Sequence, residues 1–270
     1  MPESTRITSN RNISLKEVWQ RRELIRLFAW RDIKARHKQS VLGMGWAIIY
    51  PVLMMIAFSL FFGLLVKVEH GDVPYPVFVY TALLPWLLFS EGISRMGTSL
   101  ISDISLIQKI YYPRIISPLA SVITPLLDCG ISFLILLSIA AYFGYYPSVT
   151  LLGLLFLLPL SLLLITGIGL WIAALNAEYR DMRYLLPFLT QLWVYASPVI
   201  YPSSMIPARF LFAYGILSPM AGIIEGFRWA VLGNPFPSTL LISTCIATFL
   251  FFVTGLYYFN KKERVFADVL

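Results

Sequence analysis

Residues 44–66 read MGWAIIYPVLMMIAFSLFFGLLV, an apolar run interrupted only by one proline and by small or hydroxyl-bearing side chains. At a rise of 1.5 Å per residue, a helix of this length covers the roughly 30 Å hydrocarbon core of a bilayer. The run therefore predicts a retained membrane-spanning helix and places the chain among integral membrane proteins.

The composition of the whole chain supports this class. Of the 270 residues, 58% are hydrophobic and only 13% are charged, whereas ordinary globular proteins are about 45–50% apolar. A soluble domain of this size needs more polar surface, so that class is excluded. Aromatic residues make up 15% of the chain, which is a second feature to explain.

Five further apolar runs predict spans, and they give an all-α membrane fold with six transmembrane helices. Their expected ranges are 75–97, 116–143, 151–175, 184–201 and 238–259. Residues 203–234 differ, because two apolar pieces, each too short to cross alone, are separated by Ser218-Pro219. Arg209, Glu225 and Arg228 would be costly in lipid. We expect these residues to form a re-entrant helical pair that is buried against protein.

The distribution of positive charge predicts the orientation. With both termini on one side, that side holds 18 Lys and Arg residues and the opposite side holds three. This strong bias places both termini in the cytoplasm and the re-entrant pair at the outer side. The net charge of +7 is thereby explained by topology, and nucleic-acid binding is not expected.

Residues 1–43 are predicted to form a cytoplasmic segment, and residues 44–270 a single transmembrane domain. Ser14 and Glu17 form a capping box for a helix that extends to about residue 37. One face is apolar with arginines able to reach phosphates, as in an interfacial amphipathic helix. A second, smaller apolar stripe of Leu24, Leu27 and Phe28 lies among the charges on the other side. Either this stripe contacts a cytoplasmic partner, or the helix is a membrane anchor whose polar face is imperfect. The candidate interface residues on this helix are Trp19, Arg22, Arg26, Leu27 and Phe28.

Motifs for enzymatic chemistry are missing from the sequence. It contains no phosphate-binding P-loop, no HExxH and no GxSxG. His37 and His70 lie outside the predicted spans, and Cys129 and Cys245 lie singly in apolar runs, so neither a metal site nor a disulfide is expected. Glu91 and Asp128 are ionisable groups within spans. They are either paired inside the helix bundle, or used by a stand-alone channel, a secondary transporter or a membrane-bound transferase.

The aromatic residues gather in the first, second and fifth spans. Most aromatic residues of membrane proteins face lipid or anchor at the interface. An aromatic face can also hold an uncharged sugar ring by apolar contact. The sequence is compatible with both lipid contact and sugar contact for these aromatic residues.

Several short motifs follow one another along the chain. They are SVLG at 40–43 with Trp46 and Tyr50-Pro51, LIQK at 106–109 with Tyr112-Pro113-Arg114, YRDM at 179–182, SPVIYP at 197–202, and GFR at 226–228. Taken together, these motifs resemble the transmembrane subunit of an ABC-2 type exporter, in the branch that moves lipid-linked polysaccharides such as O-antigen, capsule and teichoic acid. The resemblance covers almost the whole chain, and one departure is Ser218-Pro219, where the family more often has Asn-Pro.

The resemblance implies a homodimer in a bacterial inner membrane, associated with two copies of a separate ATP-binding subunit. No cofactor is expected in this chain, since the partner would bind ATP and Mg. The resemblance assigns coupling to the ATPase to two loops, and their candidate residues are Ile107, Lys109, Tyr112, Arg114, Arg180 and Asp181. Arg114 and Arg22 are alternative contacts for a lipid diphosphate. In a dimer, spans one and five would flank a channel, with Tyr50, Phe58, Phe62, Trp193, Tyr195 and Tyr201 as candidate substrate contacts.

Overall fold

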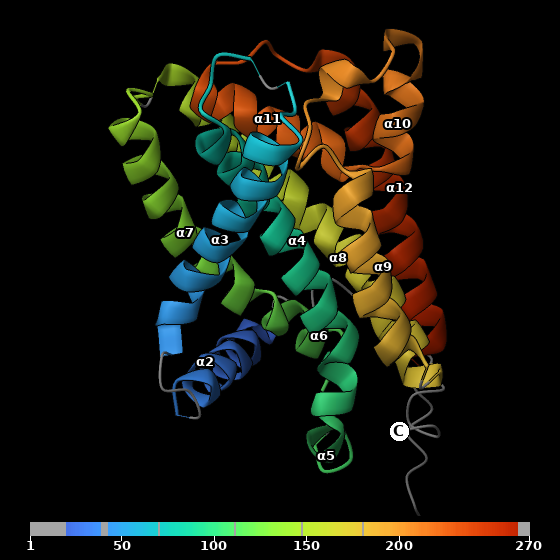
Figure 1. The fold of residues 1–270 in the computed structure, drawn as a ribbon. Helices are drawn as coiled ribbons and strands as arrows, with labels where there is room; N and C mark the ends of the chain where they lie inside the picture. The colour runs from blue at the N-terminus through green and yellow to red at the C-terminus, as the bar shows by residue number, and fades with distance from the viewer. Residues whose placement is uncertain are drawn as a thin grey trace, which may run out of the picture.

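The computed structural model describes residues 20–38, 43–69, 71–110, 112–146, 148–179 and 181–263, and within these ranges the chain is helical and has no strand. Figure 1 shows the arrangement of the helices. In chain order they are α2 (Arg22–Lys38), η1 (Gly43–Gly45), α3 (Trp46–Phe58), η2 (Ser59–Leu65), α4 (Tyr75–Ser102), α5 (Ile104–Ile107), α6 (Ile116–Ser121), α7 (Ile123–Tyr142), η3 (Val149–Gly153), α8 (Leu154–Glu178), α9 (Met182–Ala196), η4 (Ser203–Met205), η5 (Ala208–Phe210), α10 (Leu211–Leu217), α11 (Met220–Leu232) and α12 (Ser238–Lys262).

Five helical stretches of the described chain are long and apolar enough to cross a bilayer. They are 46–65, 75–102, 116–142, 149–178 and 238–262. A sixth crossing is reached if 208–217 and 220–232, which meet at a bend of 111°, count as one broken span. The prediction of an all-α membrane protein is therefore confirmed, with five to six candidate spans.

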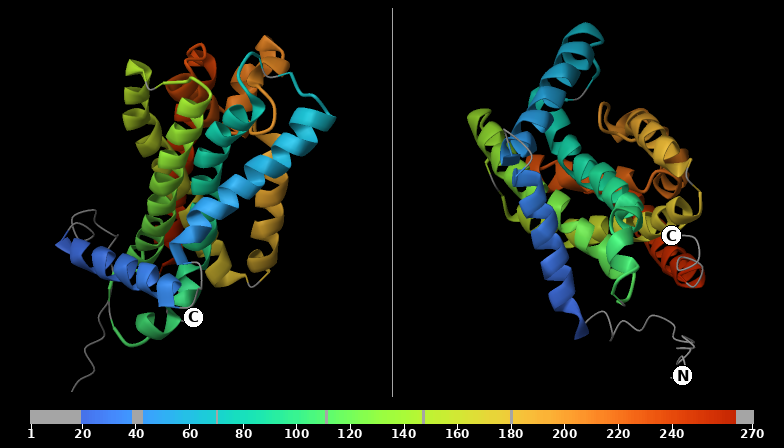
Figure 2. Two further views of the ribbon diagram at one scale, coloured as in Figure 1. Left: turned by 60° about the vertical axis from the view of Figure 1, so that its left-hand side comes forward. Right: turned by 90° about the horizontal axis from the view of Figure 1, so that it is seen from below.

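Helix α4 lies at the centre of the bundle and contacts α3, α7, α8 and α11 (Figures 1 and 2). Its side chains are mostly buried, and Val79, Leu83 and Phe89 have no exposed surface. Helix α3 is the opposite case, since only Ala47, Pro51 and Phe58 of its residues are buried. In a membrane, such a face contacts lipid or another protein chain.

The two ends of the bundle differ. At one end α2 lies across the bundle against α6, at the same end as the C-terminal ends of α4 and α12 (Figures 1 and 2). The bent pair of α10 and α11 lies at the opposite end. Below, these are called the α2 end and the α10–α11 end.

Helices α8 and α12 pack closely because glycines face each other. A Cβ atom added at Gly255 would lie 2.1 Å from the carbonyl oxygen of Gly167. A Cβ at Gly167 would likewise lie 2.6 Å from the backbone nitrogen of Phe252. Small residues allow backbones to approach in this way, and they are typical of helix contacts in membranes.

Three predicted spans differ locally from the structure. The fifth was expected over 184–201, but α9 ends at Ala196, because Pro198 disfavours helix at Ser197, whose backbone is extended. The third is broken at Val122, three residues before Pro125, which has no N–H to continue the helical bonds. In the first, Ser59–Leu65 form a π-helix.

Candidate functional site

At the α2 end, the N-terminal helix packs on the segment that leads into α6. The ring of Phe28 meets that of Tyr112 edge to face at a centroid distance of 5.3 Å. The Tyr112 hydroxyl lies 2.9 Å from that of Ser117, and burial raises the pKa of this phenol. Arg31 pairs with Asp103 at 2.8 Å. These contacts fix the position of α2 on the bundle.

This packing explains part of the second apolar stripe on α2. Phe28 is buried, and Leu24 packs against the same cluster, so both contact this chain's own α6 region. Leu27 is 61% exposed, and Arg22 and Arg26 are exposed as well. Trp19, the remaining candidate on the interface helix, lies outside the described residues.

The last turn of α12 connects to both loops predicted for coupling. The backbone N–H of Arg114 donates to Oε1 of Glu263 at 3.1 Å, and the Arg114 guanidinium donates to the Glu263 carbonyl. Lys262 pairs with Glu178, at the end of α8, at 2.7 Å. The two loops are therefore joined through one helix end.

The other coupling candidates are distributed unevenly. Lys109 and Asp181 are exposed, and Ile107 is half-buried beside the Phe28 cluster. Tyr112 faces inward. Arg180 lies outside the described residues.

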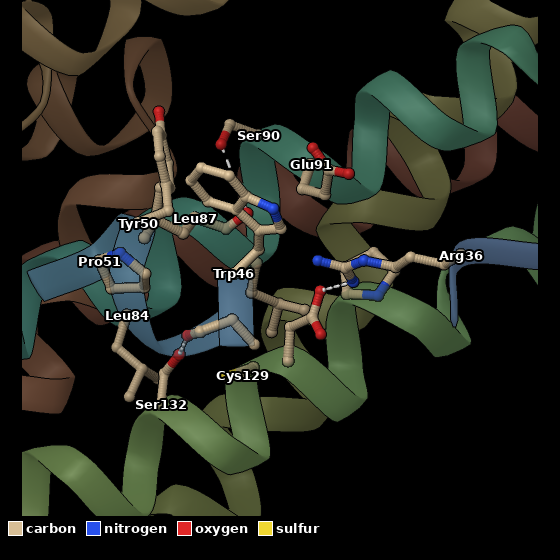
Figure 3. A pocket seen from close by; sticks show the side chains of 14 residues that line it. Arg36, Trp46, Tyr50, Pro51, Leu84, Leu87, Ser90, Glu91, Cys129 and Ser132 are labelled. Carbon is tan, nitrogen blue, oxygen red and sulfur yellow. Dashed lines mark hydrogen bonds and ion pairs between the residues drawn. The ribbon is translucent and has the colours of Figure 1, made fainter. Parts of the chain in front are cut away.

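A cavity of about 320 Å³ lies between α3, α4 and α7, and α2 closes its polar side (Figure 3). Arg36 reaches into it from α2, toward Trp46 of α3. Ser90 and Glu91 of α4 face it from the other side. The remaining lining residues are Ala47, Tyr50, Pro51, Leu84, Leu87, Leu88, Pro125, Asp128, Cys129 and Ser132.

Both intramembrane carboxylates have arginine partners. The guanidinium of Arg36 forms a close ion pair with Asp128. Arg95 pairs with Glu91 at 2.7 Å, one helical turn away. The interpretation of Asp128 and Glu91 as paired groups thus accounts for both side chains. The sequence did not single out Arg36, although a carboxylate inside a predicted span requires a cation within reach.

The aromatic residues predicted for a channel fall into two groups. Tyr50 is 50% exposed and Tyr195 is 53% exposed. Phe58 is buried against Phe62, at a centroid distance of 5.8 Å, and Trp193 packs edge to face on Phe89 at 5.3 Å. The Tyr201 hydroxyl lies 3.3 Å from that of Tyr214. Their role in transport stays a prediction.

At the α10–α11 end, Arg228 of α11 organises the segment that follows α9. Its guanidinium donates to the carbonyl oxygens of Val199, at 3.0 Å, and Tyr201, at 3.4 Å, and it pairs with Glu225 at 2.9 Å. Glu225 in turn accepts the N–H of Ser203 at 2.9 Å. The guanidinium also stacks on Phe78 of α4, 3.6 Å from the ring centroid. A pair that is costly in lipid is thus held by protein.

The comparison with known families identifies the chain. The family model for "ABC-2 type transporter" matches residues 23–232, which cover α2 to the end of α11. The chain belongs to the ABC-2 type transporter family. It is a multi-helix membrane protein of that family, as its five to six candidate spans also indicate.

Several proteins are similar to this ABC-2 chain over most of its length. The O-antigen export system permease protein RfbA of Klebsiella pneumoniae is 28% identical over 92% of this chain and 95% of its own. The protein of the same name from Myxococcus xanthus is 28% identical over 93% of this chain and 96% of its own. The polysialic acid transport protein KpsM of Escherichia coli is 25% identical over 75% and 78%.

Proposed function

We propose that this chain is the permease subunit of an exporter that moves a lipid-linked polysaccharide from the cytoplasm to the periplasm or cell surface of a bacterium. The observation that supports it best is coverage: permeases named for O-antigen export match over nine-tenths of both chains. A relative named for polysialic acid transport matches as well. The cargo is therefore of the O-antigen, capsule or teichoic acid type, and the chain lies in the inner membrane.

ATP hydrolysis takes place in a separate subunit. The sequence has no P-loop, so a partner must bind ATP and Mg. The complex contains two copies of this chain and two of the ATP-binding subunit. ATP binding can bias the helices only through contacts that differ between two states, so the permease must present docking segments.

In this proposal the α2 end faces the cytoplasm and the α10–α11 end faces outward. Positive charge supports the orientation, because 18 Lys and Arg residues fall on the α2 side and three on the other. Helix α2 then lies in the inner interface, with Trp30 exposed toward the bilayer. The bent pair enters from outside without crossing.

The ATP-binding subunit docks on residues 100–112 and 177–184. Ile107, Lys109 and Asp181 are the contacts at the surface, with Arg180 beside them. Tyr112 and Arg114 act behind them, because they bind α2, α6 and α12. Force on either loop would then reach α12 through Glu263 or Lys262.

The polysaccharide passes between two copies of the chain, along α3 and α9. Tyr50 and Tyr195 support this route, because both rings are half exposed on these helices. Phe62 and Tyr201 complete the sugar-contacting set. Phe58 and Trp193 hold this surface from behind, through Phe62 and Phe89.

Deletion of the chain from its native host tests the function. We expect finished, lipid-linked polymer to accumulate inside the deletion strain because export fails. Cell fractionation and glycan analysis detect this polymer. Loss of polymer synthesis instead would indicate a transferase. Export that continues after the ATP-binding partner is disabled would indicate a stand-alone channel or secondary transporter and would contradict the proposal.

A further inference from the structure

The cavity of Figure 3 has a polar and an apolar part. Arg36 extends from α2 and pairs with Asp128, so these two groups, with Glu91 in the same lining, mark the polar part toward the α2 end. Leu84 is seven residues before Glu91 on α4, so it lies about 10 Å closer to the α10–α11 end. A lipid of the leaflet at the α2 end has the same order, with its head group at the surface and its tails deeper.

The charges around the cavity balance. Arg36 pairs with Asp128, and Glu91 pairs with Arg95. Each pair keeps hydrogen-bonding capacity, because a guanidinium has five donors and a carboxylate accepts about four hydrogen bonds. The side chain of Glu91 is also 49% exposed. The cavity therefore offers donors for an anion beside acceptors for a cation, and the two ion pairs together carry no net charge, although Arg95 itself lies outside the lining.

Net neutrality selects the class of ligand. A lipid diphosphate has at least two negative charges, which a balanced site would leave uncompensated at membrane depth. A zwitterionic head group matches, with its phosphate on Arg36 and its ammonium on Glu91. A primary ammonium donates hydrogen bonds to a carboxylate, whereas a choline group has no N–H to donate.

The size and the mouth of the cavity also fit such a ligand. Its volume of about 320 Å³ equals that of about ten water molecules at roughly 30 Å³ each, enough for a phosphoethanolamine group. Trp46 lines the cavity and is 45% exposed. Tryptophan commonly lies at the level of lipid head groups. Leu84, Leu87 and Pro51 provide apolar wall for the start of an acyl chain.

We propose that this cavity binds one phospholipid with a phosphoethanolamine head group per chain. The lipid joins α2 to α3, α4 and α7, since its head group contacts Arg36 and Glu91 together. The inference goes beyond the proposed function and does not depend on it, because it concerns a lipid of the surrounding bilayer and not the cargo.

Native mass spectrometry of the full-length protein tests this site. The protein, with any subunits that co-purify, is reconstituted with equal amounts of phosphatidylethanolamine, phosphatidylglycerol and phosphatidylcholine and then released from the bilayer. We expect phosphatidylethanolamine to be retained in preference to both others. Glu91→Gln removes a charged acceptor and should lower its retention about tenfold, toward that of phosphatidylcholine. Glu23→Gln, at an exposed carboxylate of α2, should change nothing.

A second variant tests the cavity by filling it, without changing any charge. Ser90→Phe fills the cavity and should abolish retention, whereas Ser94→Phe, on the same helix but outside the cavity lining, should not. Equal retention of the three lipids, preferred retention of phosphatidylglycerol or of a polyprenyl diphosphate, or no effect of Glu91→Gln and Ser90→Phe would each overturn the proposal. None of these outcomes depends on export.

Discussion

The guanidinium of Arg228 has no exposed surface, yet it makes most of the polar contacts between α11 and the segment after α9. An ionised group inside a membrane protein is stable only if its hydrogen bonds and its charge are satisfied. Glu225, two backbone carbonyls and the face of Phe78 supply the counter-charge and the contacts of the two terminal nitrogens, and Nε is the one nitrogen of this side chain without a hydrogen-bond partner among the described residues. Arg228 therefore holds Val199 and Tyr201 in place, while Tyr75 binds the Ile200 carbonyl and Glu225 binds the N–H of Ser203.

Arg228→Met should destabilise the protein by about 3 kcal/mol, because it leaves Glu225 buried without its cation. The melting temperature of the detergent-purified protein, followed by tryptophan fluorescence or by size-exclusion chromatography after heating, measures the loss. Arg209→Met is the matched control, since Arg209 is exposed and should be nearly neutral. Equal melting temperatures for the two variants would contradict the role of Arg228.

Tyr195 and Trp193 are two positions apart on α9 but have different surroundings, so their substitutions should separate. Tyr195→Ala should reduce export and leave thermal stability nearly unchanged, because the ring is 53% exposed. Trp193→Ala removes the contact with Phe89 and should lower stability by about 3 kcal/mol. Surface polymer and melting temperature are measured for both. Normal export by Tyr195→Ala would contradict a substrate contact and would indicate that Tyr195 only faces lipid.

The sequence predicted which residue types mattered in the site, but not the partner of Asp128. Asp128 and Glu91 were identified because a carboxylate in an apolar run is costly. Arg36 lies 92 positions from Asp128 and is one of many N-terminal basic residues. Only the three-dimensional arrangement of α2 and α7 brings them together. The exposure of Tyr50 and the burial of Phe58 could not be separated either, because both lie in one uniformly apolar run.

At the scale of elements, the contact between α8 and α12 brings two helix backbones close together. It depends on glycines that let the two backbones meet, and Gly255 is the tightest of them. Hydropathy predicts both helices but gives no information on which faces touch. Close packing of this kind is sensitive to single methyl groups.

Gly255→Ala should destabilise the protein by about 1–3 kcal/mol, because its Cβ would clash with the carbonyl of Gly167. Gly130→Ala, in α7, is the matched control. A Cβ there meets nothing within 4 Å, and alanine is the better helix former by about 1 kcal/mol. Thermal melting of both variants measures the difference. A stabilised Gly255→Ala would show that α8 and α12 do not pack as described.

Helix ends were less predictable than helix centres. The apolar run of the fifth span continues past Ala196, so hydropathy alone extends the helix to Tyr201. The end at Ala196 is set by Pro198 and by carbonyl contacts with Arg228, which lies 29 positions from Val199. The bend between α10 and α11 was predicted correctly in place, because Ser218-Pro219 marks it locally.

For the whole molecule, charge and length give different counts of crossings. Length accepts five long helices, or six with the bent pair of α10 and α11, whereas α9 has only 15 residues. Positive charge favours an even number of crossings, because both termini are then on the basic side, so it excludes a count in which α9 and the bent pair both cross. We take α9 as the crossing and the bent pair as re-entrant. A helix of 15 residues covers about 22 Å, and the extended segment after it adds the remaining length.

Cysteine labelling from outside distinguishes the two threadings. In a background with Cys129 and Cys245 replaced by alanine, Arg209→Cys should react with a membrane-impermeant maleimide added to spheroplasts. Lys261→Cys, exposed in the last turn of α12, should react only after permeabilisation, because an odd number of crossings would be needed to place it outside. Asp181→Cys controls for the cytoplasmic side, and it too should need permeabilisation. If Lys261→Cys reacts in intact spheroplasts while Asp181→Cys does not, both α9 and the bent pair cross the membrane. The basic end of α12 would then face outward against the charge bias, and its ion pair with Glu178 and its hydrogen bonds from Arg114 would have to break.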